Sequence, residues 1–501
     1  MKKRIKKILI ANRGEIAVRV IRTCKEMGIH TVAVHSEIDA DLPHVRLADE
    51  AYCLGPAPAR ASYLNQEKIL EFAKYSKSDA IHPGYGFLAE NAGFANAVIR
   101  GGFVFIGPRP AEIASLGDKA SARQVAMRAG VPVVPGSGGT IASYRKAVSA
   151  IKLIGYPVLL KASAGGGGKG MRMVRSPGEL HAAFDSSRSE AKAAFGDDRV
   201  YVEKYIQSPR HVEVQILADS HGNFIHLGER ECSIQRRHQK IIEESPCIAL
   251  DDNGRNSLFE AALGIVRTTG YSNAGTLEFI LDQDGKFYFL EMNTRLQVEH
   301  PVTEFRTGID LVREQILIAQ GEKLSFSQSD IDFRGYSIEA RICAEDPANS
   351  FAPCTGHLKL IQHSSGYGIR EETGFAIGNE ISSFYDSLLA KLIVWGRTRQ
   401  EALNRLSSAL ESYRIYGVKN NLQLCKWIVD HQDFRRGEFD THFLQEQYSP
   451  DKLPGAPEQF LKLVSAGASY IHFSSNRQSG GKATQEVSAS KWKLRSYEHY
   501  S

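Results

Sequence analysis

Short apolar runs alternate with amphipathic stretches over the first part of the chain. Residues 7–11 and 31–35 are mainly apolar and short enough to be buried strands. Residues 15–27 carry apolar side chains at helical spacing and stop at Gly28. The strand pattern returns at 79–82 and 103–106. Strands and helices in this alternation predict a doubly wound, mostly parallel sheet up to about residue 110.

A glycine run lies between two further apolar segments. Residues 158–163 and 171–174 are both predicted to be strands, and Gly165, Gly166, Gly167 and Gly168 lie between them. Because the glycines join two strands, and not a strand and a helix, they fit neither a Walker loop nor a Rossmann turn. Their bare backbone amides are suited to covering phosphates, which predicts a mobile lid.

A polar pattern of another kind occupies a predicted hairpin. Residues 275–281 and 286–290 alternate as strands do, around the turn Asp282-Gln283-Asp284-Gly285. If the pairing closes symmetrically about this turn, Glu278 opposes Phe289. Thr276 then opposes Glu291.

This register would place three oxygen-bearing side chains on one face. Opposed residues share a face, and so do residues two apart, so Glu278, Glu291 and Asn293 should point the same way. Two carboxylates and an amide oxygen make a site for a hard cation, which we predict to be Mg²⁺ holding nucleotide phosphates. A bulge in either strand would change this geometry.

The rest of the pattern continues as alternating strands and helices. Strands are predicted at 200–206 and 212–217, and helices at 256–269 and 399–413. The basic segment 232–240 is, on local grounds, either a solvated charge run or part of a site. Polar constellations follow at 337–341 and 384–391, and the tail from 474 to 490 has the composition of a disordered linker.

Composition restricts the function classes. The chain has 501 residues, which allows two to four domains, with 42% hydrophobic and 24% charged residues as in soluble globular proteins. The formal charge of +5 does not indicate nucleic-acid binding, and no apolar run is long enough for a membrane span. The basic residues 1–7 precede too short an apolar segment for a signal peptide. The seven scattered cysteines favour reduced thiols and a cytoplasmic protein.

Four motifs then connect these patterns to one family. They are IANRGEIA at 10–17, HPGYG at 82–86, the glycine run at 165–168 and EMNTRLQVEHPVTE at 291–304. Together they closely resemble biotin carboxylase over roughly residues 4 to 447. The resemblance implies an α/β (α+β) protein with an ATP-grasp fold, an N-terminal Rossmann-like pre-ATP-grasp domain and a C-terminal biotin carboxylase domain.

The implied domains follow the chain in order. Residues 1–115 form the N-terminal domain and 116–330 the ATP-grasp domain, with a mobile glycine-rich lid at about 133–205. Residues 331–447 form the C-terminal domain, and 448–501 are a partly disordered tail. The implied reaction has two steps: ATP phosphorylates bicarbonate to carboxyphosphate, which then delivers its carbon, as CO₂, to N1′ of biotin. ATP, two Mg²⁺ or Mn²⁺ ions and carrier-bound biotin are the implied cofactors and substrate.

The resemblance also assigns roles to single residues. The implied metal ligands are Glu278, Glu291 and Asn293, in agreement with the hairpin argument. Glu299 is the implied base for bicarbonate and Arg295 its anion-binding arginine, whose planar fork suits a carboxylate-like group. Lys240 neutralises the transferring groups and Arg341 stabilises the biotin enolate. The bicarbonate and biotin pocket would consist of Lys240, Arg295, Gln297, Val298, Glu299 and Arg341.

The resemblance places the nucleotide as well. It implies that the phosphates are bound by Lys119, Lys161 and the lid glycines. The adenine edge would contact Glu203, Lys204, Tyr205 and Ile206. The ribose would contact His211, Gln235 and His238. Glu278 and Glu291 belong to this nucleotide site through the metal.

Partners are expected on other chains. The sequence has no A-M-K-M biotinylation site and no room for a carboxyltransferase, so we expect a separate biotin carboxyl carrier protein and separate carboxyltransferase subunits. A homodimer is expected on resemblance, with no nucleic-acid or membrane partner. Acetyl-CoA, another acyl-CoA and pyruvate or a similar 2-oxo acid all stay open as the final acceptor.

Two alternative functions also stay open from the sequence. Another ATP-grasp carboxylate ligase would share the hairpin carboxylates and the lid, but would not be expected to carry RLQVE at 295–299 together with Arg341. A catalytically silent regulatory subunit would have no physical need for so many converging charges.

Overall fold

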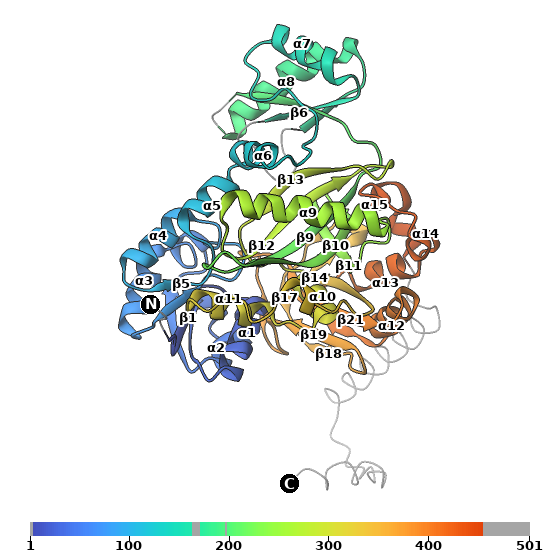
Figure 1. Ribbon diagram of the computed structural model, residues 1–501. Coiled ribbons are helices and arrows are strands. Elements are labelled where there is room, and N and C mark those ends of the chain that lie inside the picture. The colour runs from blue at the N-terminus through green and yellow to red at the C-terminus, as the bar shows by residue number, and fades with distance from the viewer. Residues whose placement is uncertain (1–3, 163–170, 196–197, 454–501) are drawn as a thin grey trace, which may run out of the picture. The chain divides into compact units, whose positions relative to one another are not determined.

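The computed structural model describes residues 4–162, 171–195 and 198–453 (Figure 1). The predicted lid glycines 165–168 and most of the predicted tail lie outside these residues. Residues 1–450 form one compact unit. Within the described part of the chain, no helix combines the length and the apolar character that crossing a membrane requires.

The N-terminal region contains the predicted parallel sheet. Its order is β3-β2-β1-β4-β5, and all of its pairs are parallel, which confirms the doubly wound prediction. The strands are β1 (Lys7–Ile10), β2 (His30–Ser36), β3 (Glu50–Gly55), β4 (Ala80–His82) and β5 (Val104–Phe105). The helices are α1 (Gly14–Glu26), α2 (Pro43–Leu47), α3 (Gln66–Tyr75), α4 (Ala92–Arg100) and α5 (Pro110–Gly117).

Both faces of this sheet are buried, which explains its nearly continuous apolar strands. Ile8 and Ile10 of β1 pack with α1 on one face, while Leu9 packs with α3 and α4 on the other. The first core also takes in Leu296 and residues of α11 (Leu311–Ala319), so it extends beyond the N-terminal sheet. The turn between β1 and α1 is therefore fixed against later parts of the chain.

The predicted strands beside the glycine run form a separate small sheet. Strands β6 (Val158–Ala162) and β7 (Met171–Val174) pair antiparallel, and β8 (Val200–Lys204) pairs with β6 on its other side. Helices α7 (Tyr144–Ile154) and α8 (Pro177–Phe195) contribute to its core, and α6 (Lys119–Arg128) precedes it. A two-stranded connection around the glycine run is thus confirmed.

An eight-stranded sheet occupies the centre of the unit. Its order is β13-β12-β9-β10-β11-β14-β21-β19. The strands are β9 (Arg210–Ala218), β10 (Phe224–Arg236), β11 (Gln239–Ser245), β12 (Asn273–Leu281), β13 (Phe287–Asn293), β14 (Tyr336–Cys343), β19 (Ile369–Thr373) and β21 (Leu388–Gly396). The antiparallel pair β11–β14 makes the sheet continuous across residue 330, where the sequence places a domain boundary.

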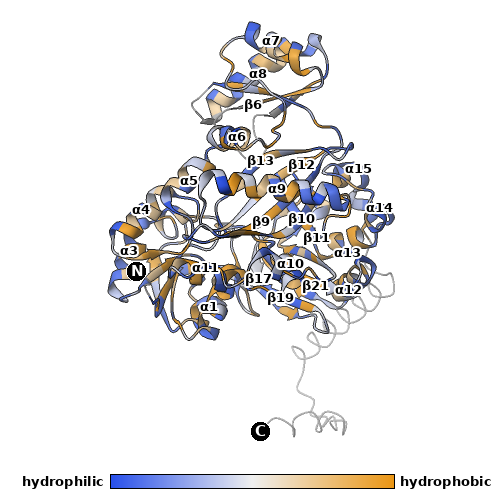
Figure 2. Cartoon of the chain, viewed as in Figure 1, coloured by the Kyte–Doolittle hydropathy of each residue, from blue (hydrophilic) through white to orange (hydrophobic). Residues whose placement is uncertain are grey.

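One face of this sheet is an ordinary apolar core. Val212, Val214 and Ile216 of β9 pack against α9 (Asp252–Thr269), which crosses the strands in Figure 1. Helix α9 alternates hydrophobic and hydrophilic residues in Figure 2, as expected for a helix that covers a sheet. The intervening residues of β9, His211, Glu213 and Gln215, are also buried. Burying polar side chains is costly unless they have partners, so a strand that buries both an apolar and a polar face indicates a functional site.

The C-terminal part completes the unit. Helix α10 (His300–Thr307) follows the hairpin β12–β13, and α12 (Arg399–Ser412) lies against β21 and β14. The remaining elements are β15 (Glu345–Asp346), β16 (Ala352–Pro353), β17 (Gly356–His357), β18 (Leu360–Gln362), β20 (Glu380–Ile381), β22 (Arg414–Tyr416), α13 (Leu422–Asp430), α14 (Gln432–Arg436) and α15 (Phe443–Gln447).

Candidate active site

The hairpin β12–β13 exists, but its predicted register is wrong. Glu278 pairs with Glu291, not with Phe289, and Thr276 pairs with Asn293, not with Glu291. The pairing nearest the turn is already one residue away from the symmetric closure, and an irregularity between Glu278 and Phe279 adds a second residue. Two one-residue shifts restore the original faces, because side chains alternate with period two. Glu278 and Glu291 therefore still share a face, and they oppose each other directly.

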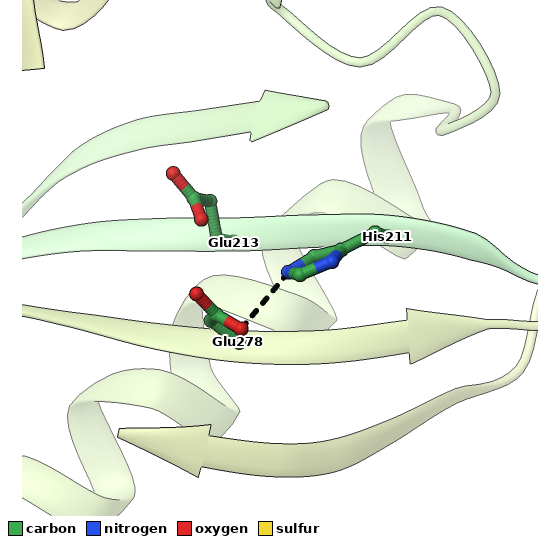
Figure 3. A group of neighbouring side chains, drawn as sticks. All are labelled: His211, Glu213 and Glu278. Carbon is green, nitrogen blue, oxygen red and sulfur yellow. Dashed lines mark ion pairs between the residues drawn. The ribbon is translucent and has the colours of Figure 1, made fainter. Parts of the chain in front are cut away.

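The buried polar face of β9 continues this group of side chains. His211 and Glu213 come from β9, and Glu278 comes from the neighbouring strand β12, where it pairs with Glu213 (Figure 3). His211 Nε2 lies 3.1 Å from Glu278 Oε2. One ligand atom from each of the three residues falls within 4.8 Å of the others, a spacing that would allow them to hold a metal ion.

Lys240 of β11 lies at the centre of these acids. Its Nζ is 2.6 Å from Glu213 Oε2, 3.2 Å from Glu278 Oε1 and 2.6 Å from Glu299 Oε1. Burial alone would lower the pKa of Lys240, but the surrounding acidic groups outweigh burial and raise this pKa well above its ordinary value. Lys240 is therefore a permanent cation. We call Glu213, Lys240, Glu278, Glu299 and Arg341 the central charge cluster.

Glu299 connects the two cations of this cluster. Its Oε2 accepts a hydrogen bond of 2.8 Å from Arg341, whose Nε also donates to Glu243 at 2.5 Å. Burial would raise the pKa of Glu299, but Lys240 and Arg341 reverse the shift and hold this pKa well below its ordinary value. Glu243 shows the opposite balance, because burial outweighs Arg341 and raises its pKa to about 7. Glu299 is thus the ionised carboxylate of the pair.

Arg230 supports the cluster from inside the sheet. It is fully buried and donates to Glu213 Oε1 at 2.5 Å and to Gln297 Oε1 at 2.7 Å. Gln297 in turn donates to Glu278 Oε1 at 2.8 Å, as Asn293 does at 2.9 Å. The amides of these two residues therefore hold in place Glu278, one of the predicted metal ligands.

Arg295 is held by an acid from the N-terminal region and by Asn293. Its Nε donates to Glu90 Oε2 at 2.9 Å, and a second nitrogen donates to Asn293 Oδ1 at 3.2 Å. Glu299, four residues later, begins α10 as its N-cap and makes its contacts with Lys240 and Arg341. Arg295 thus approaches the site through Asn293, with its guanidinium held by an acid from the N-terminal region.

The lysines assigned to phosphates also pair with acids. Lys119 Nζ is 3.0 Å from Glu291 Oε2, and Lys161 Nζ is 2.5 Å from Glu203 Oε2. Glu203 and Lys204 end strand β8, and Tyr205 and Ile206 follow it directly. Each lysine thus lies where a phosphate could replace a carboxylate as its partner.

The two remaining residues of the predicted ribose site lie at the hairpin β10–β11. Gln235 pairs with Lys240 across the two strands. His238 and Arg237 form the two-residue turn between Arg236 and Gln239, and both have positive φ, +68° and +50°. Non-glycine residues rarely adopt this conformation, so the sheet holds the His238 ring at the tip of a strained turn.

The donor set fits a magnesium nucleotide. Glu278 and Glu291 provide opposed carboxylates, the ligand type that Mg²⁺ prefers, and Lys119 already places a positive charge against Glu291. Lys240 adds a cation beside Glu278, and Lys161 adds another from β6 of the three-stranded sheet. These cations suit phosphoryl transfer, because that reaction needs charge neutralisation more than covalent help. The arrangement can bind a polyanion, hold a metal and present one ionised carboxylate, Glu299, between two cations.

Several members of the site were missed by the sequence analysis. They are Glu90, Glu213, Arg230 and Glu243. A signal existed for Glu213, because it lies two residues after His211 in a predicted strand and must share its face. Glu90 and Glu243 meet their arginine partners only through tertiary contacts, and local pattern gives no sign of them.

Comparison with known proteins shows what this arrangement resembles. Three family profiles match: "Biotin carboxylase, N-terminal domain" at residues 4–113, "Carbamoyl-phosphate synthase L chain, ATP binding domain" at 118–327 and "Biotin carboxylase C-terminal domain" at 339–446. Biotin carboxylase 1 of Bacillus subtilis is 50% identical over 442 residues, covering 88% of this chain and 98% of the relative. The 2-oxoglutarate carboxylase small subunit of Hydrogenobacter thermophilus is 51% identical, covering 93% and 99%.

A solved structure matches at the level of the fold. The biotin carboxylase domain dimer of the Hydrogenobacter thermophilus 2-oxoglutarate carboxylase, described as a complex with MgADP, ADP and bicarbonate, superposes with a TM-score of 0.86 at 50% identity. The match covers 91% of this chain and all of that one.

Proposed function

The chain belongs to the biotin carboxylase family and is an ATP-grasp ligase, and on that premise we propose how its residues carry out the ATP-dependent carboxylation of biotin. The observation that carries the proposal is the position of Glu299, held between Lys240 and Arg341 by ion pairs of 2.6 and 2.8 Å. One carboxylate is thereby placed beside two permanent cations, which can take up the charges of bicarbonate and of the transferring phosphoryl group.

The nucleotide binds between the three-stranded sheet that contains β8 and the edge of the eight-stranded sheet formed by β12 and β13. Lys119 and Lys161 exchange their carboxylate partners for phosphate oxygens, which leaves Glu291 free to bind a metal with Glu278. Mg²⁺ supplies charge neutralisation of the phosphates there. Residues 203–206 contact the adenine, while the ribose is contacted by His211, Gln235 and His238. Support for ATP and Mg²⁺ comes from the MgADP complex of the Hydrogenobacter relative.

Bicarbonate binds against Arg295, Gln297 and the backbone of Val298. Glu299 accepts its proton, so that the bicarbonate oxygen can attack the terminal phosphorus of ATP and form carboxyphosphate and ADP. A carboxylate with a strongly lowered pKa is a weak base, however. We propose that the anionic substrates draw Lys240 toward themselves, which weakens its pairing with Glu299 and raises the pKa of Glu299 toward the range a base needs.

The second step uses the other cation. Carboxyphosphate breaks into CO₂ and phosphate, and the phosphate takes the proton from N1′ of biotin. The resulting enolate oxygen is stabilised by Arg341, and N1′ then bonds to the carbon of CO₂. Glu243 holds Arg341 from behind, so the guanidinium is oriented before biotin arrives.

We propose that biotin reaches this site on a carrier protein, that a carboxyltransferase on a further chain uses the product, and that two copies of this chain form a homodimer. The names of two relatives support these partners: one is a "small subunit" and the solved one a domain "dimer". Because the chemistry of this chain ends at carboxybiotin, its site does not select the final acceptor.

The test is ADP release by the purified chain with Mg-ATP and bicarbonate, with and without free biotin. Strong stimulation by biotin is the expected result. ATP cleavage that is indifferent to biotin, or no cleavage at all, would contradict the proposed function.

A further inference from the structure

A second buried ion cluster lies next to the central charge cluster, and its charged side chains have no part in the reaction described above. Its centre is Lys391 of β21, whose side chain is 0% exposed. Lys391 Nζ donates to the carbonyl oxygen of Val298 at 2.8 Å and lies 3.0 Å from Glu372 Oε2 and 3.2 Å from Glu15 Oε1. These partners come from three distant segments, because Glu372 is in β19, Glu15 in α1 and Val298 in the loop before α10.

Glu15 extends this cluster to the loop after β4. The hydroxyl of Tyr85 donates to Glu15 Oε1, and Tyr85 belongs to the loop after β4 that carries HPGYG. The carbonyl of Tyr85 is held in turn by the Nδ2 of Asn12 at 2.7 Å. The loop at 83–87 and the segment 296–299 are therefore tied to one ammonium group.

The backbone packing around Glu15 is equally close. Gly374, just after β19, lies against the turn that leads into α1, and a Cβ at this position would overlap the backbone nitrogen of Glu15. The C-terminal region therefore contacts the β1–α1 turn through backbone as well as charge. Such an approach leaves the turn little freedom to move relative to Lys391.

The Val298 carbonyl is the important contact for chemistry. It belongs to the peptide unit whose amide nitrogen is that of Glu299, and this unit is planar. A hydrogen bond from a fully buried lysine therefore fixes the plane from which the Glu299 side chain starts. Glu299 must reach Lys240 and Arg341 together, so a small rotation of this peptide would break one of the two ion pairs.

We infer that Lys391 and Glu15 are positioning residues for bicarbonate activation, because they tie the Val298–Glu299 peptide and the Tyr85 loop to the sheet. The inference rests on the proposed role of Glu299. Neither residue touches the reacting atoms; they act by holding the peptide that carries the base, and the loop of Tyr85. Burial raises the pKa of Glu15 to about 7, while Lys391 opposes that shift.

The charged and titratable groups around the two residues come from every neighbouring element. Glu372 and Asp386 face Glu15, and Glu339 of β14 faces Lys391. None of these belongs to the proposed nucleotide site. A substitution in this cluster should therefore impair the use of bicarbonate and biotin more than the binding of ATP.

The experiment compares steady-state kinetics of the full chain with those of Glu15→Gln, Lys391→Met and the double variant. Glu15→Gln keeps the shape and an acceptor for Tyr85, so it should fold even if Lys391→Met does not. Two controls match them: Glu314→Gln removes another buried carboxyl, on α11, and Arg399→Met removes another buried ion pair, to Glu244 at 2.7 Å. Turnover number and KM are measured separately for ATP, bicarbonate and free biotin.

We expect kcat/KM for bicarbonate to fall roughly 10- to 100-fold in Glu15→Gln and in Lys391→Met, as small misplacements of catalytic groups do. KM for ATP should change by less than about threefold, and the double variant should be no worse than Lys391→Met. An unchanged kcat/KM for bicarbonate in Glu15→Gln would overturn the inference. Equal increases in KM for ATP and for bicarbonate would also overturn it. So would a similar fall of kcat/KM for bicarbonate in Arg399→Met. A wild-type chain that biotin does not stimulate would instead contradict the proposed function itself.

Discussion

Lys240 Nζ lies 2.6 Å from Glu299 Oε1, so the carboxylate proposed as base is neutralised by the lysine proposed to meet the substrates. The ion pair keeps Glu299 ionised and in position before substrates bind, and it keeps the base weak until they do. The same contact therefore accounts for both the orientation of Glu299 and its weakness as a base before the substrates bind.

The first prediction concerns the charge of Glu299. Glu299→Gln keeps the shape of the side chain but cannot take up the proton of bicarbonate, so biotin-dependent turnover should fall by at least about 10²-fold. ATP affinity should be nearly unchanged, because the phosphates are held by Lys119 and Lys161. ADP release and equilibrium nucleotide binding are the two measurements. A loss of ATP affinity as large as that of Lys161→Ala would contradict the assigned role.

The second prediction separates the chemical role of Arg341 from its structural one. Arg341→Ala should lower turnover more than nucleotide affinity, and it should also destabilise the fold by about 3–5 kcal/mol, because it leaves buried Glu243 without its cation. In Arg341→Ala/Glu243→Gln, much of the free energy of unfolding should return while turnover stays low. Recovery of turnover together with stability would show that Arg341 acts only on the fold.

The third prediction concerns the metal. Glu291→Gln removes one of two opposed carboxylates, so the Mg²⁺ concentration that gives half-maximal ADP release should rise at least about 10-fold. Asp284→Asn is the matched control, because it removes a carboxylate from the exposed turn of the same hairpin. An equal Mg²⁺ requirement in wild type and Glu291→Gln would remove Glu291 from the metal site.

The fourth prediction follows from Glu314, a buried carboxyl outside the site. Burial raises its pKa from 4.5 to about 7 in the folded protein. The folded state therefore binds more protons than the unfolded state between these two pH values, and the free energy of unfolding falls as pH rises from about 4.5 to 7. Below pH 4.5 this contribution is fully present, and above pH 7 it is lost.

Glu314→Gln should lack this dependence. Its free energy of unfolding, relative to that of wild type, should increase by about 1–3 kcal/mol between pH 4.5 and pH 8. Denaturant titrations at the two pH values measure the difference. Glu260→Gln, at an exposed position on α9, should show no such increase, and equal behaviour of the two variants would contradict the assignment of the pH dependence to Glu314.

The hairpin β12–β13 shows how much of the site the local sequence pattern could predict. The sequence placed Glu278, Glu291 and Asn293 on one face, and the structure does so, although the predicted register was wrong. Neither the offset at the turn nor the irregularity beside Glu278 has a local signal in the sequence, and either one alone would have turned Glu278 away from Glu291. The face was correct because two shifts of one residue cancel in a period of two.

Lys240, Arg341 and Glu299 illustrate the opposite case. The resemblance to a family named all three, but it did not say that they form one connected ion cluster with Glu213 and Glu243. That cluster depends on the antiparallel pairing of β11 with β14, which joins residues about one hundred positions apart. Pairing over such a separation is decided by the whole sheet, not by local propensity.

The sequence by itself determined the alternating elements of the N-terminal sheet, the strands on both sides of the glycine run, and a set of motifs that specify one family. These are local properties, since periodicity and turn residues act over a few positions. Only the tertiary structure decided which acids meet which bases: Glu90 with Arg295, Glu243 with Arg341, and Glu15 and Glu372 with Lys391. A buried charge needs a partner to offset its desolvation, and the fold brings that partner from a distant segment.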